Sequence, residues 1–207
     1  LVPVANGTQK LVIHVESAND ILAVLPLKRE MPVLDIVLVG VTEGWRVAPQ
    51  IAASGVPVIA SAVNDLPASF EQIAATQSNV GRMKAAGVNL AIGMIDDDDT
   101  RQAMHATQYA GNLVALTRIP GAAGLSWNEA FAAITSKPAQ VMGMGGEIGS
   151  LLPGRRADVV VWDGAAASAV FVVQIAVQGV LGDAEEGGDL VARLGDEQGA
   201  CVVEEAD

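Results

Sequence analysis

Short apolar runs alternate with longer amphipathic stretches over most of the chain. Four runs have the length and composition of buried strands, at 10–15, 35–39, 56–60 and 88–92. They are apolar almost throughout, which is typical of parallel strands covered on both faces. Stretches with helical periodicity separate them. Four strand–helix repeats of this kind predict right-handed crossovers and a parallel sheet in an α/β fold.

Prolines and capping residues indicate where the helices begin and end. Ser17 is placed to cap a helix, which Pro26 is expected to stop or kink. Pro49 is expected to separate or kink the first turn of the next helix. Ser126 and Glu129 have the spacing of a capping box. The helices are expected at 42–54, about 69–86, 100–116, 126–134 and 138–142.

The pattern changes after Gly149. Apolar runs at 159–162 and 170–177 predict two strands with no helix between them. From residue 178 to the end there are nine acidic residues and one basic residue, out of a net charge of −12 for the whole chain. We expect 179–207 to be an acidic, flexible tail with a weak strand at 200–203.

Composition narrows the classes of function. Aromatic residues make up 3% of the chain and no basic stripe occurs, so we expect no nucleic-acid partner. No run of about 18 apolar residues predicts a membrane span. Cys201 is the single cysteine, so it does not indicate a redox compartment. The chain starts without methionine or a visible signal peptide, as if cut from a longer protein. A soluble protein of cytoplasm or periplasm is expected, with the compartment left open.

Two segments resemble a known family. Residues 129–144 read EAFAAITSKPAQVMGM, which resembles the EALRAIT-x-NPA-x-x-LG helix pair of the amidohydrolase superfamily. Residues 149–164 resemble the GSL-x-x-GK-x-ADLVVWDG segment of the same proteins, and the subgroup resembled is imidazolonepropionase-like. A glycine-rich stretch at 143–149 departs from the dinucleotide-binding pattern at Ile148, and it follows a helix instead of a strand.

The resemblance implies a fold and a division of the chain. Residues 1–148 would be the C-terminal half, about four βα units, of a TIM-like (β/α)8 barrel, with its strands five to eight. Residues 149–178 would be part of the small composite β-sandwich domain that follows the barrel. A complete barrel needs about 250 residues. We therefore expect the isolated chain to be inactive and to self-associate, unless a missing N-terminal half joins it.

The resemblance also implies a chemistry. Family members are mostly metal-dependent hydrolases of carbon–nitrogen bonds in small cyclic or amide substrates. One or two divalent ions, zinc first among them, activate a water molecule. Two other interpretations stay open: a degenerate member of the family, without metal and with a binding role or no catalytic role, and an unrelated doubly wound binding domain.

Site residues follow from the resemblance position by position. His14 matches the metal-binding histidine of strand five, and Asp96 is expected as metal ligand and general base after strand eight, with Asp97 second. Gly40 stands where relatives often have a histidine. One metal ligand is therefore absent, and the resemblance leaves open that the metal ion itself has been lost in this chain. The alternatives are a hydrogen-bonded barrel histidine and a solvated acidic loop that caps a helix. Residues expected to line a substrate pocket, or else only to pack, are Glu43, Trp45 and Asn64.

Overall fold

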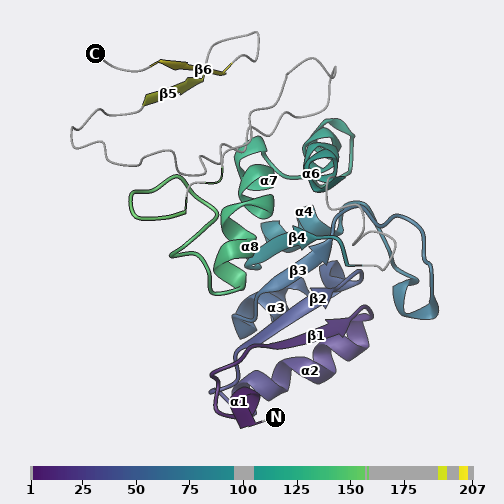
Figure 1. Cartoon of the computed structure of the whole chain (residues 1–207). Helices are drawn as coiled ribbons and strands as arrows, with labels where there is room; N and C mark the ends of the chain where they lie inside the picture. The colour runs from purple at the N-terminus through teal and green to yellow at the C-terminus, as the bar shows by residue number, and fades with distance from the viewer. Residues whose placement is uncertain (1, 96–104, 157, 159–190, 195–200, 205–207) are drawn as a thin grey trace.

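The computed structural model describes residues 2–95, 105–156, 158, 191–194 and 201–204. Its centre is a four-stranded sheet whose strands lie side by side in chain order (Figure 1). All three strand pairs are parallel. This order is that of consecutive strands in a barrel wall, which confirms the α/β part of the expected fold. The strands are β1 (Leu11–Val15), β2 (Ile36–Gly40), β3 (Val58–Ser61) and β4 (Leu90–Gly93).

Helices separate the strands along the chain. Short α1 precedes β1, α2 and α3 follow β1 and β2, and α7 and α8 lie at the β4 side of the sheet (Figure 1). The α-helices are α1 (Val2–Ala5), α2 (Ala18–Glu30), α3 (Ala48–Ser54), α4 (Asn79–Ala85), α6 (Ala106–Ala115), α7 (Trp127–Ile134) and α8 (Ser136–Val141). The 3-10 turns are η1 (Gly44–Arg46), η2 (Phe70–Gln72) and η4 (Leu116–Arg118).

The main hydrophobic core lies between one face of the sheet and the helices. Alternate strand residues enter it, because successive side chains of a strand point to opposite faces. Leu38 and Val58 are fully buried there, together with Ile21 of α2 and Ile51 of α3. We call the opposite face, which carries the other strand residues, the inner face.

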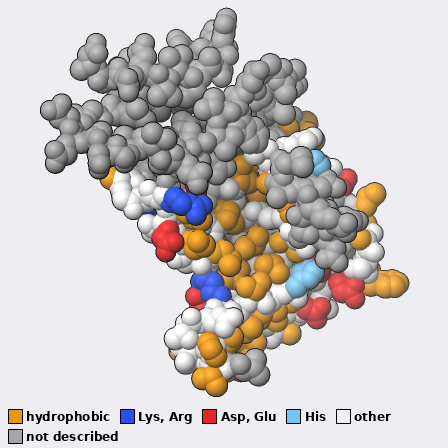
Figure 2. Space-filling view, in the orientation of Figure 1, with side chains coloured by type: hydrophobic (Ala, Val, Ile, Leu, Met, Phe, Trp, Pro, Cys, Tyr) orange, Lys and Arg blue, Asp and Glu red, His pale blue; other side chains and the backbone are white. Residues whose placement is uncertain are grey.

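Aliphatic side chains cover the inner face. Val37 and Ala91 form a second buried cluster there with Val141 of α8, and Val39 and Ile59 pack against it. Toward β1 the face becomes open, since Val12 is 48% exposed. Figure 2 shows apolar side chains gathered over the middle of the molecule in this view. In a closed barrel this face would be the interior.

Helix α8 runs at the amino-terminal end of the sheet. Lys137 Nζ lies 3.4 Å from the side-chain oxygen of Asn89, the residue before β4. A Cβ on Gly143, just after α8, would lie 3.4 Å from Lys10 Cε, just before β1. This end of the sheet is therefore partly closed.

Two prolines act differently. Pro26 does not end α2, which continues to Glu30. A proline removes one backbone hydrogen bond, and Ile21 and Leu25 still anchor this helix to the core. Pro49 lies in the first turn of α3, where a proline is tolerated, and the preceding turn is the separate element η1, as expected.

The helix expected at about 69–86 is shorter than its pattern predicted. The chain forms only the turn η2 before α4 begins at Asn79. Side chains here bind the backbone instead: the Gln72 side-chain oxygen accepts from Ala68 N–H, and Thr76 Oγ1 accepts from Ser78 N–H. Such local hydrogen bonds compete with a helix. The capping box predicted at Ser126 is present and starts α7.

The C-terminal expectations are met only in part. The strands expected at 159–162 and 170–177 lie outside the described residues, so the β-sandwich segment stays a prediction. Within the expected tail, β5 (Val191–Leu194) and β6 (Cys201–Glu204) pair as antiparallel strands, and β6 agrees with the strand expected at 200–203. Among the described residues, no helix is long and apolar enough to span a membrane.

Candidate active site

The carboxyl ends of four parallel strands bring four chain segments to one edge of the sheet. They are 14–16 at the end of β1, 40–43 at the end of β2, 61–64 at the end of β3 and 93–95 at the end of β4. Barrel enzymes carry their active sites at this edge. The polar residues at this edge are therefore the candidates for catalytic or ligand-binding roles.

His14 stands near the end of β1 and pairs in register with Val39 on the inner face. Its side chain is 55% exposed, and its Nε2 lies 2.7 Å from Glu16 Oε1. The second Glu16 oxygen accepts a hydrogen bond of 2.9 Å from Thr42 N–H. The Glu16 side chain is 11% exposed, so this carboxylate is held between two neighbouring strands. The sequence had singled out His14 but missed Glu16.

The end of β2 has an unusual backbone. Gly40 has φ 85° and Val41 has φ 58°. Among the described residues, Val41 is the one non-glycine residue with a positive φ. A β-branched residue in this region is strained. The turn directs Val41 N–H to Val15 O at 2.7 Å and Glu43 N–H to Glu16 O at 3.0 Å. The strained turn therefore fastens the end of β2 to the end of β1.

Gly40 leaves room for the carboxylate. A Cβ at this position would collide with Glu16 Oε1 and lie 2.8 Å from both Glu16 Cδ and His14 Cδ2. The space that a side chain at position 40 would occupy is thus filled by the His14–Glu16 pair. The resemblance places a histidine of relatives at this position, and here a carboxylate from the neighbouring strand takes its space.

Further polar groups continue along the edge. Thr42 is 1% exposed, and its Oγ1 accepts a hydrogen bond of 3.2 Å from Asn64 Nδ2. Ser61, at the end of β3, is buried, and its Oγ has no hydrogen-bond partner among the residues that the structure describes. Alternation along β3 puts Ser61 on the same face as Ile59. A buried hydroxyl without a partner is available to a ligand or a water molecule.

Glu43 is buried, and its carboxylate is already engaged. It accepts hydrogen bonds from Ala18 N–H at the start of α2, at 3.1 Å, and from Ala74 N–H, at 2.9 Å. Arg46 lies 3.4 Å away as its ion-pair partner. A carboxylate at a helix N-terminus is stabilising. The geometry gives Glu43 a role inside the fold, and substrate contact by this residue stays a prediction.

Trp45 packs toward α4. Its indole N–H donates to Ala74 O at 2.8 Å, its backbone N–H donates to Asn79 Oδ1 at 2.9 Å, and the Arg82 guanidinium lies 4.6 Å from the ring centroid. These contacts tie η1 to the helical layer. Substrate contact by Trp45 stays a prediction. Asn64 is linked to the His14–Glu16 pair through Thr42, whose backbone N–H donates to Glu16.

Asp96 and the rest of the acidic loop lie outside the described residues. Within the described residues, no group of three or more His, Cys, Asp and Glu side chains is arranged to hold a metal ion. His105, the other histidine of the chain, stands at the start of α6, edge-on to Tyr109 at 6.4 Å. Of the predicted ligands, the structure therefore places His14.

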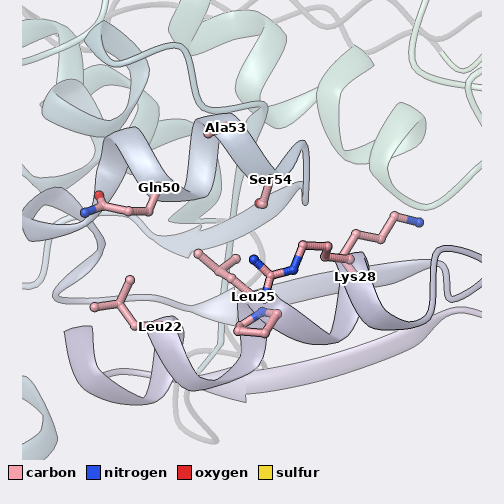
Figure 3. Close-up of a pocket in the computed structure, with 8 residues that line it drawn as sticks. Leu22, Leu25, Lys28, Gln50, Ala53 and Ser54 are labelled. Carbon is pink, nitrogen blue, oxygen red and sulfur yellow. The ribbon is translucent and has the colours of Figure 1, made fainter.

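Grooves occur elsewhere on the molecule. One, of about 530 Å³, lies between α2 and α3, where Leu22 and Leu25 face Gln50 and Ala53 (Figure 3). Another, of about 510 Å³, is lined by parts of α4, α7 and the start of β4. Both lie among the outer helices, away from the His14–Glu16 pair.

The parallel sheet with its polar strand ends is that of part of a (β/α)8 barrel, and comparison with known proteins identifies the family. The sequence profile of the amidohydrolase family matches residues 14–184. The match covers more than half of the chain, which therefore belongs to the amidohydrolase family. This confirms the resemblance and excludes an unrelated doubly wound domain.

Particular relatives agree. Over 99 residues the chain is 33% identical to imidazolonepropionase from Maricaulis maris, a stretch that is 47% of this chain and 23% of that protein. The structure resembles an amidohydrolase from Thermotoga maritima MSB8, with a TM-score of 0.64, 22% identity and coverage of 76% of this chain and 38% of that one.

A second solved structure, an adenosine deaminase from Xanthomonas campestris with bound zinc, gives a TM-score of 0.52. Its identity is 23%, over 73% of this chain and 36% of that protein. The chain spans less than half the length of each of these three relatives. At such identities the two structural likenesses concern the fold alone.

Proposed function

We propose that this chain supplies half of the active site of an amidohydrolase that cleaves a carbon–nitrogen bond, other than a peptide bond, in a small cyclic or amide substrate. The observation that carries the proposal is the position of His14. It lies on the inner face at the carboxyl end of a parallel strand, is accessible, and is held by Glu16. Family membership supports the reaction class.

A divalent metal fits this site only in part. The imidazole of His14 is a donor that zinc accepts, but catalytic zinc sites have three protein ligands. We propose that Asp96 and the remainder of a complete barrel provide the other donors. A bound divalent ion supplies a water molecule of lowered pKa and polarises the scissile bond. In this chain, His14 is proposed as a donor and Asp96 as the base that passes a proton to the leaving nitrogen.

A second candidate function is a family member without metal, with a binding role or none in catalysis. One observation favours it: the space next to Gly40 is occupied by Glu16, so no side chain at that position can reach into the site. The two candidates differ in whether metal is required.

Metal analysis of the full-length protein separates the two. Zinc, iron and manganese content and amide-hydrolysis activity are measured with and without a chelator. We expect the metal-loaded protein to be active, and His14→Asn to lose metal and lower kcat/KM by more than about 100-fold. His105→Asn is the control and should keep both properties. Full activity in a metal-free preparation would rule out the metal-dependent mechanism.

The isolated chain should bind metal weakly and show no turnover. Its described residues include no group of three or more potential ligands, and a tight site needs more donors than His14 alone. Size-exclusion chromatography, metal analysis and a screen of cyclic and linear amides test this. A metal-loaded, catalytically active monomer of this chain would contradict the expectation.

A further inference from the structure

We propose that Glu16 is a positioning residue that fixes the orientation and the tautomer of His14, and that it does so from the space left free by Gly40. Nothing in the sequence resemblance gave Glu16 a role. The proposal rests on contacts between β1 and β2 at the carboxyl edge of the sheet. Its consequence for catalysis rests on the function proposed above, whereas its test does not.

Three contacts hold Glu16 in place. Oε1 is 2.7 Å from His14 Nε2, Oε2 accepts from Thr42 N–H at 2.9 Å, and the Glu16 carbonyl accepts from Glu43 N–H at 3.0 Å. The two backbone donors follow the left-handed turn at Gly40 and Val41. A backbone N–H can only donate, so Thr42 N–H requires an acceptor and binds Oε2. Oε1 is then the carboxylate oxygen that faces the imidazole.

The nature of the partner decides the tautomer. An ionised carboxylate only accepts hydrogen bonds, so the neutral His14 ring must carry its proton on Nε2. Nδ1 is then the nitrogen with a free lone pair. A carboxylate that binds one nitrogen of a histidine is a known means of orienting the other nitrogen toward a metal ion or a proton. Nδ1 of His14 is thus the atom available for chemistry.

Glu16→Gln makes a sharp test of this assignment. The amide introduced by this substitution has one oxygen and one NH2 group, and Thr42 N–H requires the oxygen. The NH2 group then faces His14, which favours Nε2 as an acceptor and the ring proton on Nδ1. Glu16→Ala removes the partner altogether and leaves the ring free to populate both forms.

Nitrogen NMR of the 207-residue chain, labelled with ¹⁵N-histidine, measures the tautomer ratio of His14 directly. The chain has two histidines, so His105 is an internal reference and His14→Asn assigns the signals. At alkaline pH, where imidazole is neutral, we expect the Nε2–H form of His14 in the wild type. Glu16→Gln should shift the tautomer ratio toward Nδ1–H by about two- to fivefold, with His105 unchanged.

Gly40→Ala tests the steric half of the proposal. An added methyl would collide with the Glu16 carboxylate, so we expect this variant to loosen the pair and shift the His14 ratio as Glu16→Ala does. Gly55→Ala is the matched control, because Gly55 also has positive φ, at 68°, but no atom lies within 4 Å of an added Cβ. His14 nitrogen signals that are the same in wild type, Glu16→Gln, Glu16→Ala and Gly40→Ala would overturn the proposal.

Discussion

Single residues at the carboxyl edge of the sheet depend on one another across strands. Gly40 has no side chain, Glu16 fills the resulting space, and His14 takes its orientation from Glu16. Val41 keeps a strained backbone conformation between Gly40 and the donor Thr42. Strained backbone is common at functional sites, where the surrounding contacts maintain it. A site of this kind tolerates few substitutions.

Ser61 offers a prediction at the residue scale. Its Oγ is buried and unpartnered, so Ser61→Ala removes a hydroxyl whose desolvation is not compensated. We expect the free energy of unfolding to stay the same or to rise by up to about 1 kcal/mol. Urea denaturation measures it.

Ser54→Ala is the comparison for Ser61→Ala. The Ser54 hydroxyl donates to Ile51 O at 2.7 Å and accepts from Val56 N–H at 3.1 Å. This substitution should lower the free energy of unfolding by about 1 kcal/mol. A similar loss for Ser61→Ala would mean that Ser61 has a partner, such as a bound water.

Helix α4 depends on close packing against the chain that follows α6. Gly81 lies inside α4, and a Cβ there would collide with the backbone of Ala123 and lie 2.7 Å from Gly124 N. Glycine to alanine normally stabilises a helix by about 1 kcal/mol. Here we expect Gly81→Ala to lower the free energy of unfolding by about 1–3 kcal/mol, because backbone cannot easily move aside.

Gly146→Ala is the control for Gly81→Ala. No atom lies within 4 Å of an added Cβ at this exposed position, so the change in stability should be within about 0.5 kcal/mol. Chemical denaturation of both variants tests the contact. A Gly81→Ala protein as stable as the Gly146→Ala protein would show that α4 does not pack as described.

The capping box of α7 makes a pH-dependent prediction. Hydrogen bonds from the Ser126 hydroxyl and backbone N–H, together with Lys84 nearby, lower the pKa of Glu129. Because the pKa is lower in the folded state, Glu129 stabilises the fold above its unfolded pKa, and this contribution is lost as pH falls through the folded pKa. Ser126→Ala should lower the free energy of unfolding by about 1 kcal/mol at pH 7.

At low pH the wild type and Ser126→Ala should become more alike in stability, since protonated Glu129 no longer receives the same support. Urea titrations at neutral pH and at about pH 3 measure the difference. In a Glu129→Gln background the Ser126→Ala effect should lose its pH dependence. An effect that grows as pH falls would contradict the assignment.

At the scale of the whole molecule, the open edges of the sheet predict association. Among the described strands, β1 and β4 each have one unpaired edge, and Val12 on the inner face is 48% exposed. Unpaired strand edges beside apolar surface favour pairing with another chain. We expect the 21.2 kDa chain to elute as a larger, concentration-dependent species in size-exclusion chromatography.

Val12→Lys should shift this equilibrium toward monomer, because a charge on the inner face opposes burial. Val2→Lys, at a position in α1 that is 75% exposed, is the matched control and should leave association unchanged. A chain that is monomeric at all concentrations, or that associates equally as Val12→Lys, would show that the inner face is not the contact surface.

Much of the architecture could be predicted from local patterns. Apolar runs located all four strands within a residue or two, and the Ser126–Glu129 spacing located α7, because both signals arise from contacts within a few residues. The helix expected at about 69–86 was too long, since local side-chain hydrogen bonds in that segment replaced helical ones.

The site was predictable only in part. His14 could be found because strand-end position and family resemblance both point to it. Glu16 could not, because its role depends on its distance to Gly40, at the end of the next strand, and to Thr42, which follows 26 residues after Glu16. The hydrogen bond from Ala18 N–H, at the start of α2, to the Glu43 carboxylate could not be predicted either, because the two residues are far apart in the sequence.

The sequence by itself thus determined the strand–helix alternation, the family and the edge of the sheet where chemistry belongs, because periodicity, capping and motif spacing are properties of neighbouring residues. The tertiary structure alone decided which polar groups meet at that edge. Parallel strands bring together residues far apart in the chain, and a left-handed turn at Gly40 and Val41 aims backbone donors at a carboxylate on another strand. No local pattern encodes such a distance.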